Sequence, residues 1–111
     1  MPESELAVVT TRLVERLAGV TPSWFGARAA GSAHSRSHLV RELVLELAEL
    51  GRQAGSGAPA GAAPHPVGVH ALADQVAVLA RDIGAAPALT PEIEARAACA
   101  ISAGYDALWV R

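Results

Sequence analysis

Residues 51–68 can continue neither a helix nor a strand. This segment reads GRQAGSGAPAGAAPHPVG and holds five glycines and three prolines. Glycine leaves the backbone permissive, while proline fixes φ and removes a hydrogen-bond donor, so the segment predicts a flexible crossover. On both sides of it, apolar residues recur at helical spacing. The chain therefore reads as helical segments divided by a long connection.

We predict an all-α fold, a small helical bundle of four main helices plus one short helix. Serine and threonine N-caps and glycine stop signals at positions 19, 31, 51 and 84 delimit the segments. The main helices are expected over about 4–18, from a serine between 32 and 37 to 50, over 69–83 and from 91 onward, with the short helix over 22–30. An up-down bundle and a looser orthogonal array both fit, because the crossover permits a long connection. At 111 residues the chain is expected to form one domain, 1–111.

The helix that ends at residue 50 has the broadest apolar face in the sequence. Its core-facing candidates are Leu39, Val40, Leu43, Val44, Leu47 and Leu50. Leu45 falls on the opposite face, so we expect this helix to be covered on several sides. Small residues dominate 95–104 and predict close packing of the last helix. These two surfaces predict a homo-oligomer, most simply a homodimer.

Charge and composition argue against several classes of protein. A formal charge of -2 and a pI near 6.0 make a nucleic-acid partner unlikely on electrostatic grounds. No apolar run approaches the length of a membrane span, and the first residues lack the basic start of a secretory signal, so we predict a cytoplasmic protein without a membrane partner. Cys99 is the single cysteine and is expected to be a small buried hydrophobe.

The sequence predicts no enzyme, no cofactor and no metal site. It contains no glycine-rich phosphate loop, no H-E-x-x-H and no G-x-S-x-G. His34 and His38 stand four residues apart and could share a metal within one helix, with metal-dependent activity as the corresponding alternative. The serines around them favour a helix start inside that stretch, which predicts ordinary surface or capping histidines instead.

Residues 21–38, TPSWFGARAAGSAHSRSH, form the candidate binding region. The candidate residues are Trp24, Phe25, Arg28, His34, Arg36 and His38. Tryptophan and arginine are enriched in binding hot spots, and a guanidinium can stack on an indole or grip a carboxylate or phosphate. The alternative is that Trp24 and Phe25 fill the base of the bundle core. In the binding hypothesis, Arg28 and Arg36 are expected to be exposed.

The function that follows is a non-catalytic protein-protein interaction or assembly module that self-associates and can take a protein partner. The alternative is a small ligand-sensing or DNA-binding helical regulator, whose ligand would need a pocket of roughly several hundred cubic ångströms. Glu42, Glu46 and Glu49 share one helical face, which fits either a solvated edge or a surface for a basic partner.

Overall fold

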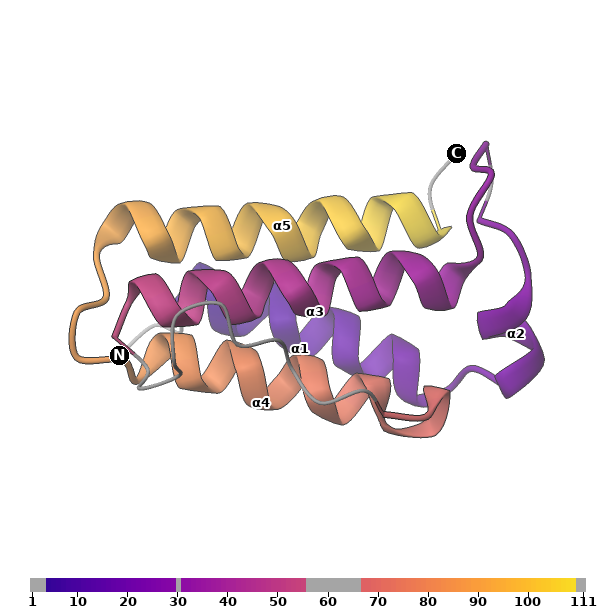
Figure 1. The fold of residues 1–111 in the computed structure, drawn as a ribbon, viewed down its shortest axis with the longest axis horizontal. Coiled ribbons are helices and arrows are strands. Elements are labelled where there is room, and N and C mark those ends of the chain that lie inside the picture. The colour runs from indigo at the N-terminus through magenta and orange to yellow at the C-terminus, as the bar shows by residue number, and fades with distance from the viewer. Residues whose placement is uncertain (1–3, 30, 56–66, 110–111) are drawn as a thin grey trace.

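The computed structural model describes residues 4–29, 31–55 and 67–109, and the regular elements in these residues are helices (Figure 1). The elements are α1 (Glu5–Ala18), α2 (Pro22–Gly26), α3 (Arg36–Gln53), the 3-10 turn η1 (Val69–Ala71), α4 (Leu72–Gly84) and α5 (Pro91–Trp109). The four long helices α1, α3, α4 and α5 pack as a bundle, and α2 covers one end of it. The predicted class, four main helices and one short helix, is confirmed.

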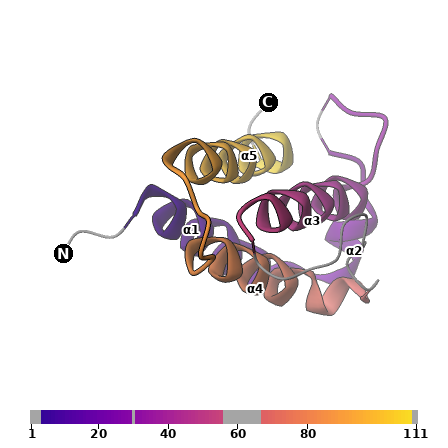
Figure 2. The ribbon, with the colours of Figure 1, turned by 60° about the vertical axis from the view of Figure 1, so that its left-hand side comes forward.

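The long connection gives the bundle its topology. α3 and α4 both run away from the end that α2 covers, whereas α1 and α5 run toward it (Figure 1). At the opposite end, the N–H of Ala88 in the α4–α5 turn donates to the carbonyl of Ala54 just after α3, at 2.8 Å. Each of α1 and α3 packs between α4 and α5, as the turned view shows (Figure 2). The C-terminal ends of α1 and α5 therefore meet the start of α3 at the end covered by α2.

Side-chain caps begin the helices where the sequence predicts them. The hydroxyl oxygens of Ser4, Thr21, Ser35 and Thr90 each accept a hydrogen bond from a backbone N–H three residues later, at 3.1 to 3.2 Å. Proline occupies the first position of α2 and of α5. Such caps satisfy N–H groups that have no partner within the helix, and proline has no N–H to satisfy there. Of the three serines predicted to compete, Ser35 caps α3.

Two predicted boundaries were wrong. Gly51 does not stop α3, because the helix continues to Gln53 and buries Gly51. The chain leaves the helical conformation at Gly55, whose φ of 82° lies in the left-handed region that glycine tolerates best. The crossover therefore starts later than residue 51, and residues 56–66 lie outside the described part of the chain.

The short helix also ends earlier than predicted, at Gly26 rather than near residue 30. After it the chain forms a loop in which Arg28 and Ser35 pair as an isolated antiparallel bridge. The N–H of Arg36 donates to the carbonyl of Ala27 at 2.8 Å, which fixes the start of α3 against the end of α2. The helix predicted over 69–83 begins as the 3-10 turn η1 and continues as α4. Gly84, the predicted stop signal, is the last residue of α4.

Leucine, valine and isoleucine fill the core, as the scarcity of aromatic residues requires. The largest fully buried side chains are Leu13, Leu47, Leu50, Leu72, Ile83, Ile101, Val40 and Val76. The broad face of α3 is covered by both α4 and α5. Leu45 on its opposite face is 54% exposed, so the side of α3 that carries Leu45 is not covered within the single chain, contrary to our expectation. α5 approaches α3 closely at Gly104, where an added Cβ would lie 3.3 Å from Leu43 Cδ2. The small residues of α5 thus permit close packing.

Two leucines of α3 provide a matched test of this core. Leu47 is fully buried, so Leu47→Ala should lower the free energy of unfolding by about 2–5 kcal/mol. The same change at the exposed Leu45 should alter it by less than about 0.5 kcal/mol. Urea unfolding followed by circular dichroism measures both values. Equal losses at the two positions would contradict the orientation of α3.

Candidate functional site

All four aromatic side chains of the sequence gather at the end of the bundle that α2 covers. Trp24 of α2 stacks on Trp109 of α5, with ring centroids 5.1 Å apart and planes at 23°. Tyr105 lies 5.0 Å from Trp109 along α5, and Phe25 meets Trp24 edge to face at 5.2 Å. Offset stacks and edge contacts are the geometries that aromatic rings prefer. The rings therefore form one continuous row across the bundle end.

Three arginines lie over these rings. The guanidinium carbon of Arg12 is 4.3 Å from the centroid of Tyr105. That of Arg16 is 4.7 Å from Trp109, and that of Arg36 is 4.7 Å from Trp24. These distances fall within the range of cation–π attraction. We call this set the arginine–aromatic cluster, and its members are Arg12, Arg16, Trp24, Arg36, Tyr105 and Trp109.

The helical repeat and the topology together build the cluster. Arg12 and Arg16 are one turn apart on α1, and Tyr105 and Trp109 are one turn apart on α5, so each pair shares a face. α1 and α5 pack side by side in the same direction, which brings the two pairs together near their C-terminal ends (Figure 1). α2 then carries Trp24 across this end, and the start of α3 adds Arg36.

Hydrogen bonds fix two of the arginines. Arg16 Nη1 donates to the hydroxyl of Tyr105 at 2.5 Å. This hydrogen bond lowers the pKa of Tyr105 below its ordinary value, with a smaller contribution from Arg12 and an opposing effect of desolvation. Arg36 Nη1 donates to the carbonyl of Trp24 at 3.3 Å. Within the described residues, none of the three cluster arginines has a carboxylate within ion-pair distance.

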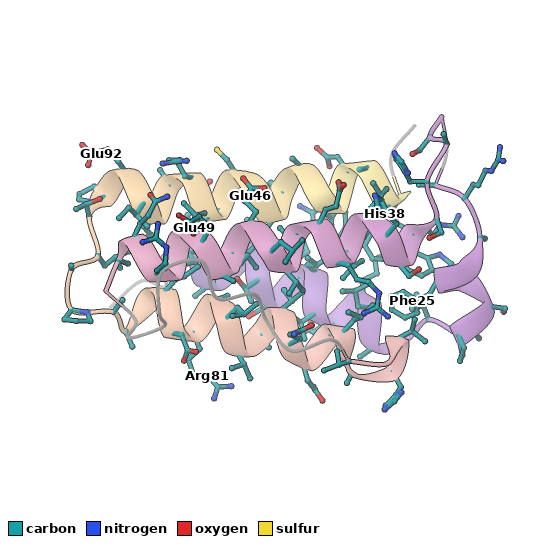
Figure 3. All side chains as sticks on the ribbon, in the orientation of Figure 1. Phe25, His38, Glu46, Glu49, Arg81 and Glu92 are labelled. Atoms are coloured by element: carbon teal, nitrogen blue, oxygen red, sulfur yellow. The ribbon has the colours of Figure 1, made fainter. Side chains whose placement is uncertain are left out.

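The structure brings part of the predicted region into the cluster. Trp24 is half-buried and Phe25 is buried, so Phe25 belongs to the core while Trp24 links core and surface. Arg36 is half-buried against Trp24, which corrects the expectation that it is exposed, and its Nε is buried without a hydrogen-bond partner. Arg28 is exposed on the loop after α2 and lies over no aromatic ring of the described residues. Phe25 and His38 mark this end of the molecule in Figure 3.

His34 and His38 do not share a helix. His34 precedes the cap Ser35, and His38 lies in the first turn of α3. Their rings nevertheless stack, with centroids 4.3 Å apart, and His38 Nε2 lies 3.0 Å from Glu42 Oε1. In the described ranges, no group of three or more histidine, cysteine, aspartate or glutamate side chains is placed to hold a metal ion.

Four members of the cluster were missed by sequence reasoning. Arg12, Arg16, Tyr105 and Trp109 lie outside residues 21–38, the region that the sequence indicated as the candidate site. The sequence does place two arginines four residues apart near one helix end and two aromatic residues four residues apart near another, so each pair shares a helical face. Only the order in which the helices pack shows that these pairs meet.

A groove of about 500 Å³ runs between α3 and α5. Leu39 and Leu43 line it from α3, and Cys99, Ala103 and Gly104 line it from α5. Cys99 is exposed, so the prediction of a buried cysteine was wrong. The cysteine belongs to a row of exposed small side chains at four-residue spacing, which comprises Ala95, Cys99, Ala103 and Ala107.

Another hollow, of about 340 Å³, lies beside Phe25 at the base of α2. Leu17 and Pro22 contribute apolar walls, and His70 and Asp74 contribute polar groups from η1 and α4. Its volume is within the range of small-molecule sites. This is the place that the small-ligand alternative would use.

The acidic face of α3 is largely satisfied within its own helix. Glu42 pairs with His38, and Glu49 accepts hydrogen bonds from Arg52 and Gln53. The hydrogen bond from Arg52 lowers the pKa of Glu49 to about 2. All three glutamates, including Glu46, are exposed. Figure 3 places Glu46 and Glu49 along α3 and Glu92 at the end remote from the cluster.

No protein-family model, curated protein or solved structure matches the chain. None of the helices in the described part of the sequence is both long enough and apolar enough to cross a bilayer. The case for a function therefore rests on the chemistry of the cluster and the grooves.

The single tyrosine offers a direct test of the cluster's electrostatics. Because Arg16 favours the phenolate of Tyr105, Arg16→Met should raise the pKa of Tyr105 toward that of ordinary tyrosine. Alkaline titration of the tyrosinate absorbance measures this shift, with circular dichroism as a check on folding. Arg81→Met, on α4, should leave the midpoint unchanged. An unchanged midpoint in the Arg16 variant would contradict the hydrogen bond.

Proposed function

We propose that this protein is a non-catalytic interaction module and that the arginine–aromatic cluster is its partner-binding surface. The main support for the proposal is that three guanidiniums lie over aromatic rings. None of these guanidiniums forms an ion pair with a carboxylate of the described residues. Arg12 and Arg16 are exposed, so a partner can reach them. Tryptophan, tyrosine and arginine are the residue types that dominate binding hot spots. Rings already packed in the free protein lose little conformational freedom on binding.

Partner capture tests this proposal. Tagged protein is incubated with lysate of the producing cells, and bound proteins are quantified by mass spectrometry. Arg12→Gln with Arg16→Gln should abolish the enrichment of at least one protein that the unmodified chain captures. Arg52→Gln with Arg81→Gln removes the same charge from arginines outside both the cluster and the groove between α3 and α5, and this variant should retain the enrichment. Identical capture by both double variants would contradict the proposal.

Self-association is the second part of the proposed function. The groove between α3 and α5, together with the exposed small residues beside it, allows the backbone of a second helix to approach closely. Around it lie Glu42 and Glu46 on the α3 side and Arg96 on the α5 side. In a two-fold arrangement such opposite charges can pair between copies. We propose a homodimer formed through this face.

A large charged side chain in the middle of this face should separate the dimer. Ala103 is exposed, so Ala103→Arg should change the stability of the single chain by less than about 0.5 kcal/mol while it blocks the approach of a second helix. Light scattering at micromolar concentration should report a dimer for the unmodified chain and a monomer for this variant. Ala7→Arg, at an exposed position of α1, should remain dimeric. A monomeric unmodified chain would refute self-association.

A further inference from the structure

We infer that the partner of the arginine–aromatic cluster is an acidic protein segment, bound through its Asp or Glu carboxylates to Arg12 and Arg16. This inference rests on the proposed function and specifies the chemistry of the partner.

The stacked arrangement leaves hydrogen-bond donors available. A guanidinium is planar, and its N–H groups point outward in that plane. When the plane lies on a ring, these N–H groups stay accessible at its edge. Arg16 uses one nitrogen for the hydroxyl of Tyr105, and Arg12 lies over the same ring, so both guanidiniums keep further N–H groups for a ligand. Carboxylates accept such donors in pairs, and the charge makes each bond stronger than a neutral one.

The ring faces, in contrast, are occupied. Trp109 has Trp24 stacked at 5.1 Å and the guanidinium of Arg16 at 4.7 Å from its ring centroid. Trp24 likewise has Trp109 and the guanidinium of Arg36 against it. Single-stranded nucleic acid binds proteins largely by stacking its bases on open aromatic faces. The formal charge of -2 also opposes a polyanion the length of a nucleic acid. The cluster therefore favours a short acidic segment.

The charged side chains that lie over the aromatic rings are all cations. Arg36 occupies the first turn of α3, where the helix dipole disfavours a cation and no acidic residue offsets it. Asp106 lines a small cavity with Arg12 and Tyr105 but lies beyond ion-pair distance of Arg12. A carboxylate from a partner would reduce the repulsion among these cations. Arg36 is half-buried, so its part is to hold Trp24 while Arg12 and Arg16 meet the ligand.

The spacing of the exposed arginines specifies the pattern of the ligand. One helical turn separates Arg12 from Arg16, which is a rise of about 6 Å. In an extended peptide, alternate side chains lie on one side and are spaced by about 6.6 Å. Carboxylates at every second position of an extended segment therefore match the two guanidiniums. Glu-x-Glu is the simplest such pattern.

Intrinsic fluorescence provides the measurement, because both tryptophans of the chain belong to the cluster. The probe is a short alternating Glu-Ser peptide, titrated into the full chain at low salt. We expect binding to change the tryptophan emission. The affinity should fall, and the Kd should rise, when salt is added. Arg12→Gln with Arg16→Gln should weaken binding by about tenfold or more, as loss of hot-spot residues does. Arg52→Gln with Arg81→Gln, outside both the cluster and the groove between α3 and α5, should bind like the unmodified chain.

A charge-preserving variant separates geometry from net charge. Arg12→Lys with Arg16→Lys keeps both positive charges but loses the planar fork, so it should bind more weakly than the unmodified chain and more tightly than the glutamine variant. Circular dichroism of each variant checks that the fold is retained.

Three results would overturn the inference. The first is that the matching Gln-Ser peptide binds as tightly as the Glu-Ser peptide. The second is that both glutamine double variants lose the same affinity for the Glu-Ser peptide. The third is that a single-stranded oligonucleotide or a phosphorylated Ser peptide binds more tightly than the Glu-Ser peptide. If capture depends on Arg12 and Arg16 while the Glu-Ser peptide does not bind, the proposed function stands and the acidic class of partner is wrong.

Discussion

The structure depends on covering the broad apolar face of α3 from two sides. One neighbouring helix is too narrow to bury Leu43, Val44 and Leu47 together, and the bundle places α4 on one flank and α5 on the other. α4 runs parallel to α3, so the chain has to return to the end where α3 begins before α4 starts (Figure 1). A glycine- and proline-rich stretch of sequence stands at this point, between two strongly helical segments.

This topology also determines which side chains meet at the bundle end. Since α5 follows α4 with a short turn, it runs back beside α1 and ends next to it. Arginines near the C-terminus of α1 lie where the helix dipole favours cations, and Tyr105 and Trp109 present rings to them. The core is thus mainly aliphatic, with Phe25 as its one buried aromatic ring among the described residues, and guanidiniums lie over Trp24, Tyr105 and Trp109.

Local chemistry made most of the fold predictable, because caps and helical periodicity act within a few residues. Ser4, Thr21 and Thr90 start helices as their sequences indicate. Gly51 failed as a stop signal because tertiary packing buries it inside α3 and outweighs its weak helix propensity. The site was predictable only in part: Trp24 and Arg36 are close in sequence, whereas Arg16 and Tyr105 are 89 residues apart and meet through the packing order alone.

Nuclear magnetic resonance tests the central claim, that the packing order builds a row of rings and guanidiniums at the bundle end. The account predicts nuclear Overhauser contacts between the indoles of Trp24 and Trp109, and upfield ring-current shifts of the side-chain protons of Arg16. Both signals report the row directly in solution. Two indoles without mutual contacts, together with Arg16 protons at random-coil shifts, would contradict the packing order and the site built on it.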